Sequence, residues 1–277
     1  MKVDSEIIAE GLAFPEGPRW RNNLLWFSDF YSGKVYTLSL AGQLEKQIDV
    51  PSQPSGLGWT PEGHLLVVSM IDRKLLRWDG KDLEEVVDLS ALAGGCCNDM
   101  YVANDGTAFV GNFGFDIFGG ETFRPARLIK VTPNADVEVA AEDMHFPNGT
   151  VVVNNGQTLI VAESFANRLT AFDIDPHGAL SRRRVWADLG EHSPDGLCLD
   201  RDGGIWVATP GPGRAGLVRV VKNGEITHEI TVSQDAYACA LTGDGRYLLV
   251  CTSAHAEPSE CLRYRSGRIE KVDLTGL

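Results

Sequence analysis

The chain has 277 residues, 43% of them hydrophobic, which is enough to build a sizeable core. It carries 25 basic and 38 acidic side chains, so its formal charge at neutral pH is −13. The longest basic run is only Arg182-Arg183-Arg184. Because an acidic chain of this kind cannot neutralise phosphates, nucleic acid and anionic membranes are excluded as expected partners.

The N-terminal residues Met1–Glu6 include two acids where a secretory signal needs an apolar run, and no later segment reaches the ~18 apolar residues of a membrane span. We therefore expect a cytoplasmic protein. A reducing compartment and the absence of Cys-x-x-Cys spacing favour free thiols over disulfides. The cysteines concerned are Cys96, Cys97, Cys198, Cys239, Cys251 and Cys261.

A short apolar run that ends in a small or polar residue recurs six times along the chain. The six runs are 25–28, 66–69, 108–111, 159–162, 205–208 and 248–251. Each follows a turn rich in Gly, Asn or Asp and precedes a second alternating strand. A repeat of ~40–50 residues built from consecutive strands is typical of a propeller blade. The sequence predicts an all-β fold, a six-bladed β-propeller that forms one domain over residues 1–277. The alternative is a large β-sandwich, which need not repeat its turns in phase.

The ends of the chain indicate how the ring closes. The sixth repeat runs out of chain soon after residues 268–272, whereas residues 6–9 precede the first repeat and have no blade of their own. We predict that this N-terminal segment supplies the outer strand of the last blade, because the pairing removes two open sheet edges.

Six residues stand nine to eleven positions before the apolar runs, where the inner strand of each blade enters the central channel. They are Glu16, Ser55, Asn98, Asn148, Asp195 and Cys239. Four of them offer oxygen donors, and two of those four are anionic. Such a set suits one divalent cation, Ca²⁺ above Mg²⁺, Mn²⁺ or Zn²⁺. The alternative is that Pro-Glu-Gly, Pro-Asn-Gly and Pro-Asp-Gly are merely turns.

The motifs around these positions resemble those of the senescence marker protein/gluconolactonase/luciferin-regenerating enzyme family. The resemblance covers nearly the whole chain. The motifs are Phe-Pro-Glu-Gly-Pro at 14–18, Asn-Asp at 98–99, Phe-Pro-Asn-Gly at 146–149 and Ser-Pro-Asp-Gly at 193–196.

The resemblance implies a six-bladed propeller with one catalytic divalent cation that hydrolyses lactones or related esters. It also implies that Glu16, Asn148 and Asp195 are metal ligands. Asn98 matches a position that contacts the substrate or serves as a fourth ligand. The expected partner is a small-molecule lactone or ester.

One departure from the family pattern concerns substrate choice. Sugar-lactone members carry an Arg two residues before the Asn that corresponds to Asn98, but Cys96 and Cys97 stand there in this chain. The lengthened third repeat also brings four Phe towards the channel mouth, which favours an apolar substrate. The alternative is that these Phe only pack the loop onto blades three and four. The predicted substrate-binding residues are Asn98, Cys97, Cys96, Phe113, Phe115, Glu121 and His255.

Asp195 is the predicted catalytic base or nucleophile, because it is one of only two carboxylates in the ring. Asp99 is the second candidate, with the alternative that it points away and anchors its blade. No serine has a nucleophile-elbow context, so a triad esterase is disfavoured. The predicted enzyme is a metal-dependent lactonase. The alternatives are phosphotriester or aryl-ester hydrolysis at the same metal, or a propeller that binds a metabolite without catalysis.

Overall fold

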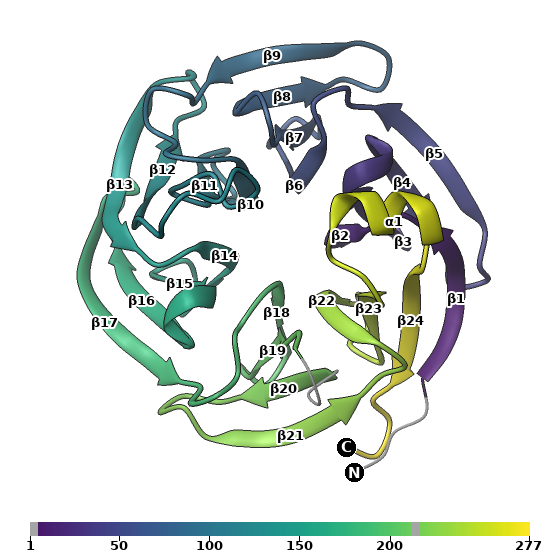
Figure 1. Ribbon diagram of the computed structural model, residues 1–277. Helices are drawn as coiled ribbons and strands as arrows, with labels where there is room; N and C mark the ends of the chain where they lie inside the picture. The colour runs from purple at the N-terminus through teal and green to yellow at the C-terminus, as the bar shows by residue number, and fades with distance from the viewer. Residues whose placement is uncertain (1–4, 212–215) are drawn as a thin grey trace.

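The computed structural model describes residues 5–211 and 216–277, which form six four-stranded antiparallel sheets arranged around a central axis (Figure 1). The prediction of a six-bladed β-propeller is confirmed. Blade one comprises β2 (Pro15–Arg21), β3 (Leu24–Asp29), β4 (Lys34–Leu38) and β5 (Leu44–Asp49). Blade two comprises β6 (Pro54–Trp59), β7 (Leu65–Ser69), β8 (Lys74–Trp78) and β9 (Leu83–Asp88). Blade three comprises β10 (Cys97–Val102), β11 (Ala108–Asn112), β12 (Ala126–Val131) and β13 (Val137–Met144).

The remaining blades follow the same order from the inner strand outwards. Blade four comprises β14 (Pro147–Val153), β15 (Thr158–Glu163), β16 (Arg168–Ile174) and β17 (Leu180–Asp188). Blade five comprises β18 (Leu197–Leu199), β19 (Ile205–Ala208), β20 (Gly216–Val220) and β21 (Ile226–Thr231). Blade six comprises β22 (Asp235–Leu241), β23 (Tyr247–Ser253), β24 (Gly267–Asp273) and β1 (Ser5–Leu12).

The six apolar runs of the sequence form the second strand of each blade, and their side chains fill the seams between neighbouring blades. In the seam between blades two and three, Val68 of β7 packs in one cluster with Met100 of β10 and Val110 of β11, all nearly inaccessible to solvent. A matching cluster joins blades four and five through Ile160 and Val207. Burial of this apolar surface holds the blades together, at roughly 25 cal/mol per Å².

The N-terminal strand closes the ring as predicted. β1 lies beside β24, antiparallel, with Ser5 opposite Val272 and Glu10 opposite Arg268. The hydroxyl of Ser5 donates a 2.5 Å hydrogen bond to Glu270, a fully buried acid that also accepts bonds from Ser233. The first described residues of the chain are thus tied to the last blade by both backbone and side-chain bonds, and Figure 1 shows β1 beside β24 at the outer edge of this blade.

The inner strands approach one another closely next to the channel. A Cβ at Gly149 would lie 2.6 Å from the backbone nitrogen of Leu197 and 2.7 Å from the carbonyl oxygen of Asp195, so only glycine fits there. Gly196 meets Ala238 of the next blade in the same way. Because these glycines directly follow Asn148 and Asp195, the close approach fixes where those two side chains start.

Three short helical segments lie on one face of the ring: η1 (Phe30–Ser32), η2 (Ser164–Ala166) and α1 (Pro258–Tyr264) (Figure 1). Among the described residues no helix has the length and apolar character needed to cross a bilayer.

Deletion of residues 1–10 should lower the melting temperature by roughly 5–10 °C, because it exposes the edge of β24 and removes a partner of buried Glu270. Thermal unfolding followed by circular dichroism measures the shift. Deletion of residues 1–4 leaves β1 intact and is the matched control. Identical melting of the two truncated proteins would contradict the role of β1 in closing the ring.

Candidate active site

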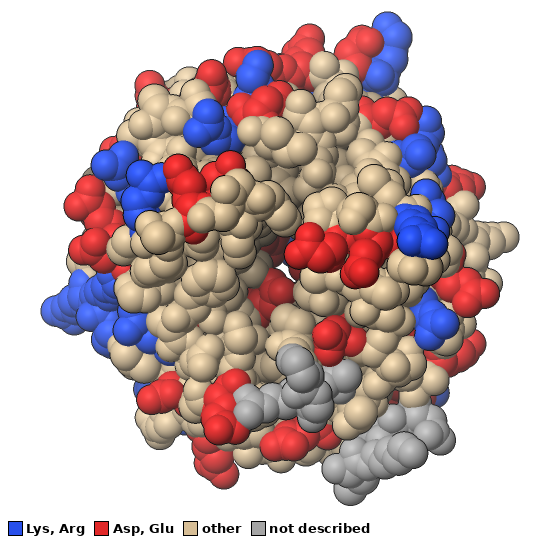
Figure 2. All heavy atoms as spheres, in the orientation of Figure 1, with Lys and Arg blue, Asp and Glu red and all other residues tan. Residues whose placement is uncertain are grey.

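A cavity of about 710 Å³ opens at one end of the central channel, on the face that carries η1, η2 and α1. Figure 2 shows this face hollowed at its centre, with acidic atoms visible at the bottom of the hollow. Glu16, Asn98, Asn148 and Asp195 all line the cavity. They come from four different blades and stand at, or just before, the start of an inner strand, so the structure brings the four predicted oxygen donors together.

The other two positions of the predicted ring do not contribute as expected. Ser55 is buried, and its carbonyl accepts a 2.6 Å bond from the Ser28 hydroxyl. The sixth position is occupied by Tyr237, not Cys239. Tyr237 directly follows the paired residue Ala236 at the register shift of β22, as Asn98 follows Cys97 and Asn148 follows Pro147, and it therefore lines the cavity.

Two acids at the cavity floor have few hydrogen-bond partners. Glu16 is 6% exposed, and its Oε2 accepts a 2.7 Å bond from the Gly17 backbone N–H. Asp195 accepts a bond at Oδ1 from the Asn148 side-chain amide. Among the described residues no side chain donates a hydrogen bond to Glu16 Oε1 or Asp195 Oδ2, although the Gly196 backbone N–H also stabilises the Asp195 carboxylate. Few donors therefore hold these two carboxyl groups.

Burial and the charge of Asp195 raise the pKa of the Glu16 carboxyl well above its ordinary value. Burial likewise raises the pKa of Asp195 to about 8, against the opposing hydrogen bond from Asn148. Two acids in this state are stabilised by a nearby positive charge. The electrostatics of the floor therefore fit a bound cation.

The two amides complete an all-oxygen donor set. The Asn98 amide nitrogen donates a 3.4 Å bond to the Pro147 carbonyl, and the Asn148 amide nitrogen donates a 3.3 Å bond to the Ser164 hydroxyl. No hydrogen bond to either side-chain carbonyl oxygen is found in residues 5–211 and 216–277. Two carboxylates and two amide oxygens match the preferences of hard cations such as Ca²⁺. The set contains only two acids, and nowhere in the described chain do three or more His, Cys, Asp or Glu side chains form a group that could hold a metal ion.

Aromatic side chains form the cavity walls. Phe146 stacks between Phe113, at 4.4 Å between ring centroids, and Phe165, at 4.7 Å, with all three rings nearly parallel. On another wall Phe14 packs 4.6 Å from Tyr237. Phe146 also has a φ of 62°, a backbone conformation that costs energy for a bulky residue. Phe146, whose backbone is strained, stands two residues before Asn148. The stack of three rings forms part of the cavity wall.

Asp99 does not line this cavity. Its Oδ1 forms a 2.6 Å ion pair with Arg19 and accepts a 2.8 Å bond from the Met100 backbone N–H. Its side chain is 8% exposed. The structure thus places Asp99 outside the cavity lining, in the position of the alternative in which this acid anchors its blade, although its charge still raises the pKa of Glu16 and Asp195.

Several predicted substrate contacts also lie outside the cavity lining. Cys97 is fully buried in the seam between blades two and three, because its side chain faces away from the channel. Cys96 packs as a partly buried member of the cluster beneath Phe113. Glu121 is exposed and pairs with Arg124 at 2.6 Å.

Phe115 and His255 are the other two predicted contacts that do not line the cavity. Phe115 is buried against Phe123 and Phe165, so it supports the wall from behind. His255 stacks on Tyr264 at 4.8 Å and places its Nδ1 3.3 Å from Glu260, outside the cavity. Of the four Phe in the long third repeat, Phe113 and Phe118 line the cavity, as does Asn98 among the predicted contacts.

The sequence reasoning missed Tyr237, Ser164 and Ser193, which also line the cavity. Ser193 could have been predicted from the sequence, because it opens the Ser-Pro-Asp-Gly motif. In the structure its hydroxyl donates a 2.8 Å hydrogen bond to the Ser164 carbonyl. Phe146 could have been predicted in the same way, because it directly precedes Pro147 and Asn148 in the Phe-Pro-Asn-Gly motif.

The fold and the site define a six-bladed propeller with two acids and two amides at the floor of a cavity at one end of its channel. Within that class, residues 14–255 match the SMP-30/Gluconolactonase/LRE-like region. The chain belongs to this family.

Three relatives illustrate the similarity. An L-arabinolactonase from Azospirillum brasilense is 30% identical over 161 residues, 55% of this chain and 51% of that protein. The structure of a gluconolactonase from Xanthomonas campestris has a TM-score of 0.77 at 21% identity, covering 96% of this chain and 88% of its own. The structure of a calcium-binding regucalcin from Agrobacterium tumefaciens has a TM-score of 0.82 at 21% identity, covering 98% and 94%.

The raised pKa of Asp195 has a measurable effect on stability in the absence of a cation. The folded-state pKa of about 8 lies above the unfolded value near 4, so its contribution to stability is complete below about pH 4 and is lost as the pH rises towards 8. We expect the melting temperature of the chelated protein to fall over this range. Asp195→Asn should flatten the profile and melt several degrees higher at pH 8.

Glu45→Gln removes an exposed acid and is the matched control, with a profile like that of the unmodified chain. An Asp195→Asn protein that melts below the unmodified chain at pH 8, both being chelated, would contradict the electrostatic account of the site.

Proposed function

We propose that the protein is a divalent-cation-dependent hydrolase of lactones that carry apolar substituents. The observation that carries this proposal is the convergence of two poorly solvated carboxylates and two free amide oxygens on the floor of an aromatic-walled cavity. Membership of a family with lactonase relatives supports the reaction class. The aromatic walls support the apolar substituent, because sugar hydroxyls would find few polar partners there.

Glu16, Asn98, Asn148 and Asp195 are the residues that would hold the cation. Ca²⁺ is the first choice, since every donor is oxygen and one structural neighbour is a calcium-binding protein. Mg²⁺, Mn²⁺ and Zn²⁺ are the alternatives. A cation bound here supplies the positive charge that polarises a substrate carbonyl and lowers the pKa of water.

Asp195 is the proposed general base, with its Oδ2 as the proton acceptor. It takes a proton from water as the water oxygen bonds to the lactone carbonyl carbon. It then returns that proton to the ring oxygen as the carbon–oxygen ester bond breaks, and the product is a hydroxy acid. Asn148 holds the Asp195 carboxylate through its amide N–H and is held in turn by the Ser164 hydroxyl.

Chelation should abolish hydrolysis of an alkyl-substituted γ-lactone, and restoration with a panel of metals should recover it, with Ca²⁺ among the active ions. Glu16→Gln and Asp195→Asn should each lower kcat/KM by about 100-fold or more, while Glu45→Gln retains full activity. Phosphotriesters and aryl esters belong in the same assay. Failure to hydrolyse any lactone with any metal would refute the proposal, and turnover of phosphotriesters alone would favour the alternative reaction.

The aromatic stack predicts how affinity depends on the substrate tail. Phe165 is 48% exposed at the mouth and stacks on Phe146. Phe165→Ala should raise KM for a long-chain γ-lactone roughly 5–10-fold with kcat nearly unchanged, because about 1–1.5 kcal/mol of apolar contact is lost. KM for γ-butyrolactone, which has no tail, should not change.

Ile71→Ala provides the control for this substitution, since Ile71 is 57% exposed but does not line the cavity. Equal effects of Phe165→Ala on tailed and tailless lactones would show that the stack does not contact the tail.

A further inference from the structure

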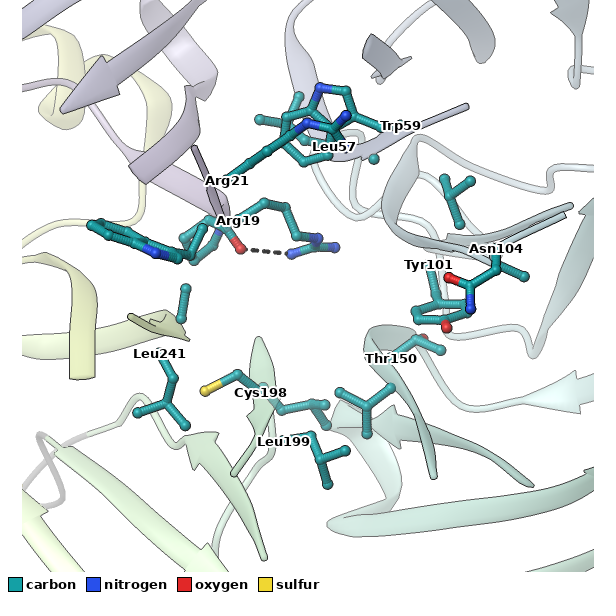
Figure 3. Close-up of a pocket in the computed structure, with 18 of the residues that line it drawn as sticks. Arg19, Arg21, Leu57, Trp59, Tyr101, Asn104, Thr150, Cys198, Leu199 and Leu241 are labelled. Carbon is teal, nitrogen blue, oxygen red and sulfur yellow. Dashed lines mark hydrogen bonds between the residues drawn. The ribbon is translucent and has the colours of Figure 1, made fainter. Parts of the chain in front are cut away.

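A second cavity, of about 540 Å³, lies at the opposite end of the central channel. The same inner strands line both cavities: Glu16 and Asn148 reach the first, whereas Arg19 and Thr150, farther along β2 and β14, reach the second. Figure 3 shows the second cavity, with Arg19 and Cys198 on its walls. Nothing in the proposed lactone chemistry uses this space.

Two cysteines from neighbouring blades meet at the wall of this cavity. Cys198 of β18 and Cys239 of β22 both line it, and their sulfur atoms are 3.5 Å apart. Cys198 is half-buried, whereas Cys239 is 1% exposed. A small solute in the cavity therefore reaches Cys198 first and finds a second thiol directly behind it.

The backbone around the two cysteines holds them in register. The Gly196 N–H donates a 2.8 Å hydrogen bond to the Tyr237 carbonyl, and Gly196 packs against Ala238. Cys198 lies two residues after Gly196, and Cys239 lies one residue after Ala238. A disulfide needs the two sulfur atoms, now 3.5 Å apart, to approach by about 1.5 Å.

No other thiol of the described chain has this arrangement. Cys97, Cys251 and Cys261 are buried and line neither cavity, and Cys96 packs in the aromatic cluster that also contains Cys261. Among the described residues the only sulfur–sulfur contact is that between Cys198 and Cys239. This contact distinguishes the pair from the other four thiols.

We propose that Cys198 and Cys239 form a peroxide-sensitive thiol pair, an oxidative modification site that closes as a disulfide between blades five and six. The Cys198 thiolate attacks a hydroperoxide, its sulfur bonds to one peroxide oxygen, and the oxygen–oxygen bond breaks to give a sulfenic acid and hydroxide. The Cys239 sulfur then displaces the sulfenic oxygen, which leaves as water with the Cys239 proton. The two thiols are oxidised by two electrons and the peroxide is reduced.

Burial, together with the neighbouring Cys198, raises the pKa of the Cys239 thiol well above its ordinary value. Cys239 is therefore the poorer thiolate and the poorer initial target. This asymmetry gives the roles their order, with Cys198 attacked by the oxidant and Cys239 resolving the intermediate. The resulting disulfide joins β18, which follows Asp195, to β22, which contains Tyr237.

The test is treatment of the reduced, folded full-length chain with hydrogen peroxide, followed by alkylation of free thiols in denaturant and peptide mass mapping. We expect a cross-linked peptide pair that contains Cys198 and Cys239, two fewer alkylated thiols than in the reduced protein, and reversal by dithiothreitol. The oxidised protein should also melt at a higher temperature than the reduced protein.

Cys198→Ser should abolish both the cross-link and the rise in melting temperature, and Cys239→Ala provides a second variant in case the first is poorly folded. Cys96→Ser is the matched control and should cross-link like the unmodified chain. Over-oxidation of Cys198 without a cross-link, or a cross-link between any other cysteines, would overturn the proposal. Neither readout uses lactone hydrolysis, so the outcome is independent of the proposed function.

Discussion

Repulsion between two carboxylates that few hydrogen-bond donors reach is the constraint on which the site depends. Glu16 on blade one and Asp195 at the start of blade five share the floor of one cavity, and burial raises the pKa of both. The packing of the blades holds them there against this repulsion. A bound cation converts the same arrangement into a stabilising one. The site is thus unfavourable without an ion, which is the expected signature of a functional position on a stable scaffold.

Other buried acids of the ring provide the contrast. Glu163 accepts bonds from Arg168 and from the His145 backbone N–H, and these partners hold its pKa below its ordinary value despite the burial. Glu270 is surrounded by hydroxyl and backbone donors from Ser5, Ser233 and Thr252. These acids stabilise their blades and need no ion. Glu16 and Asp195 have fewer donors among the described residues, and this difference supports the proposal that they are the acids of the functional site.

The fold and the donor set follow from the periodicity of the sequence, whereas side-chain directions do not. The repeat predicted six blades, and the lack of a partner for residues 6–9 predicted closure by β1. The spacing before each apolar run of the repeat singled out Glu16, Asn98, Asn148 and Asp195. It pointed to Cys239 and not Tyr237, because a spacing of nine to eleven residues before the apolar run admits both. It did not place Cys97 and His255, because proximity in sequence to a donor or a loop does not decide which face a side chain takes. Those directions are set by packing in the seams between blades.

The central claim is that a cation replaces a proton at the cavity floor. Calorimetric titration of the chelated protein with Ca²⁺ at pH 7, in two buffers of different ionisation enthalpy, counts the protons released. Because the pKa of Asp195 is about 8 without a cation, the account predicts saturable binding of one ion with release of about one proton. Binding with the same heat in both buffers, or no binding of any divalent cation, would contradict it.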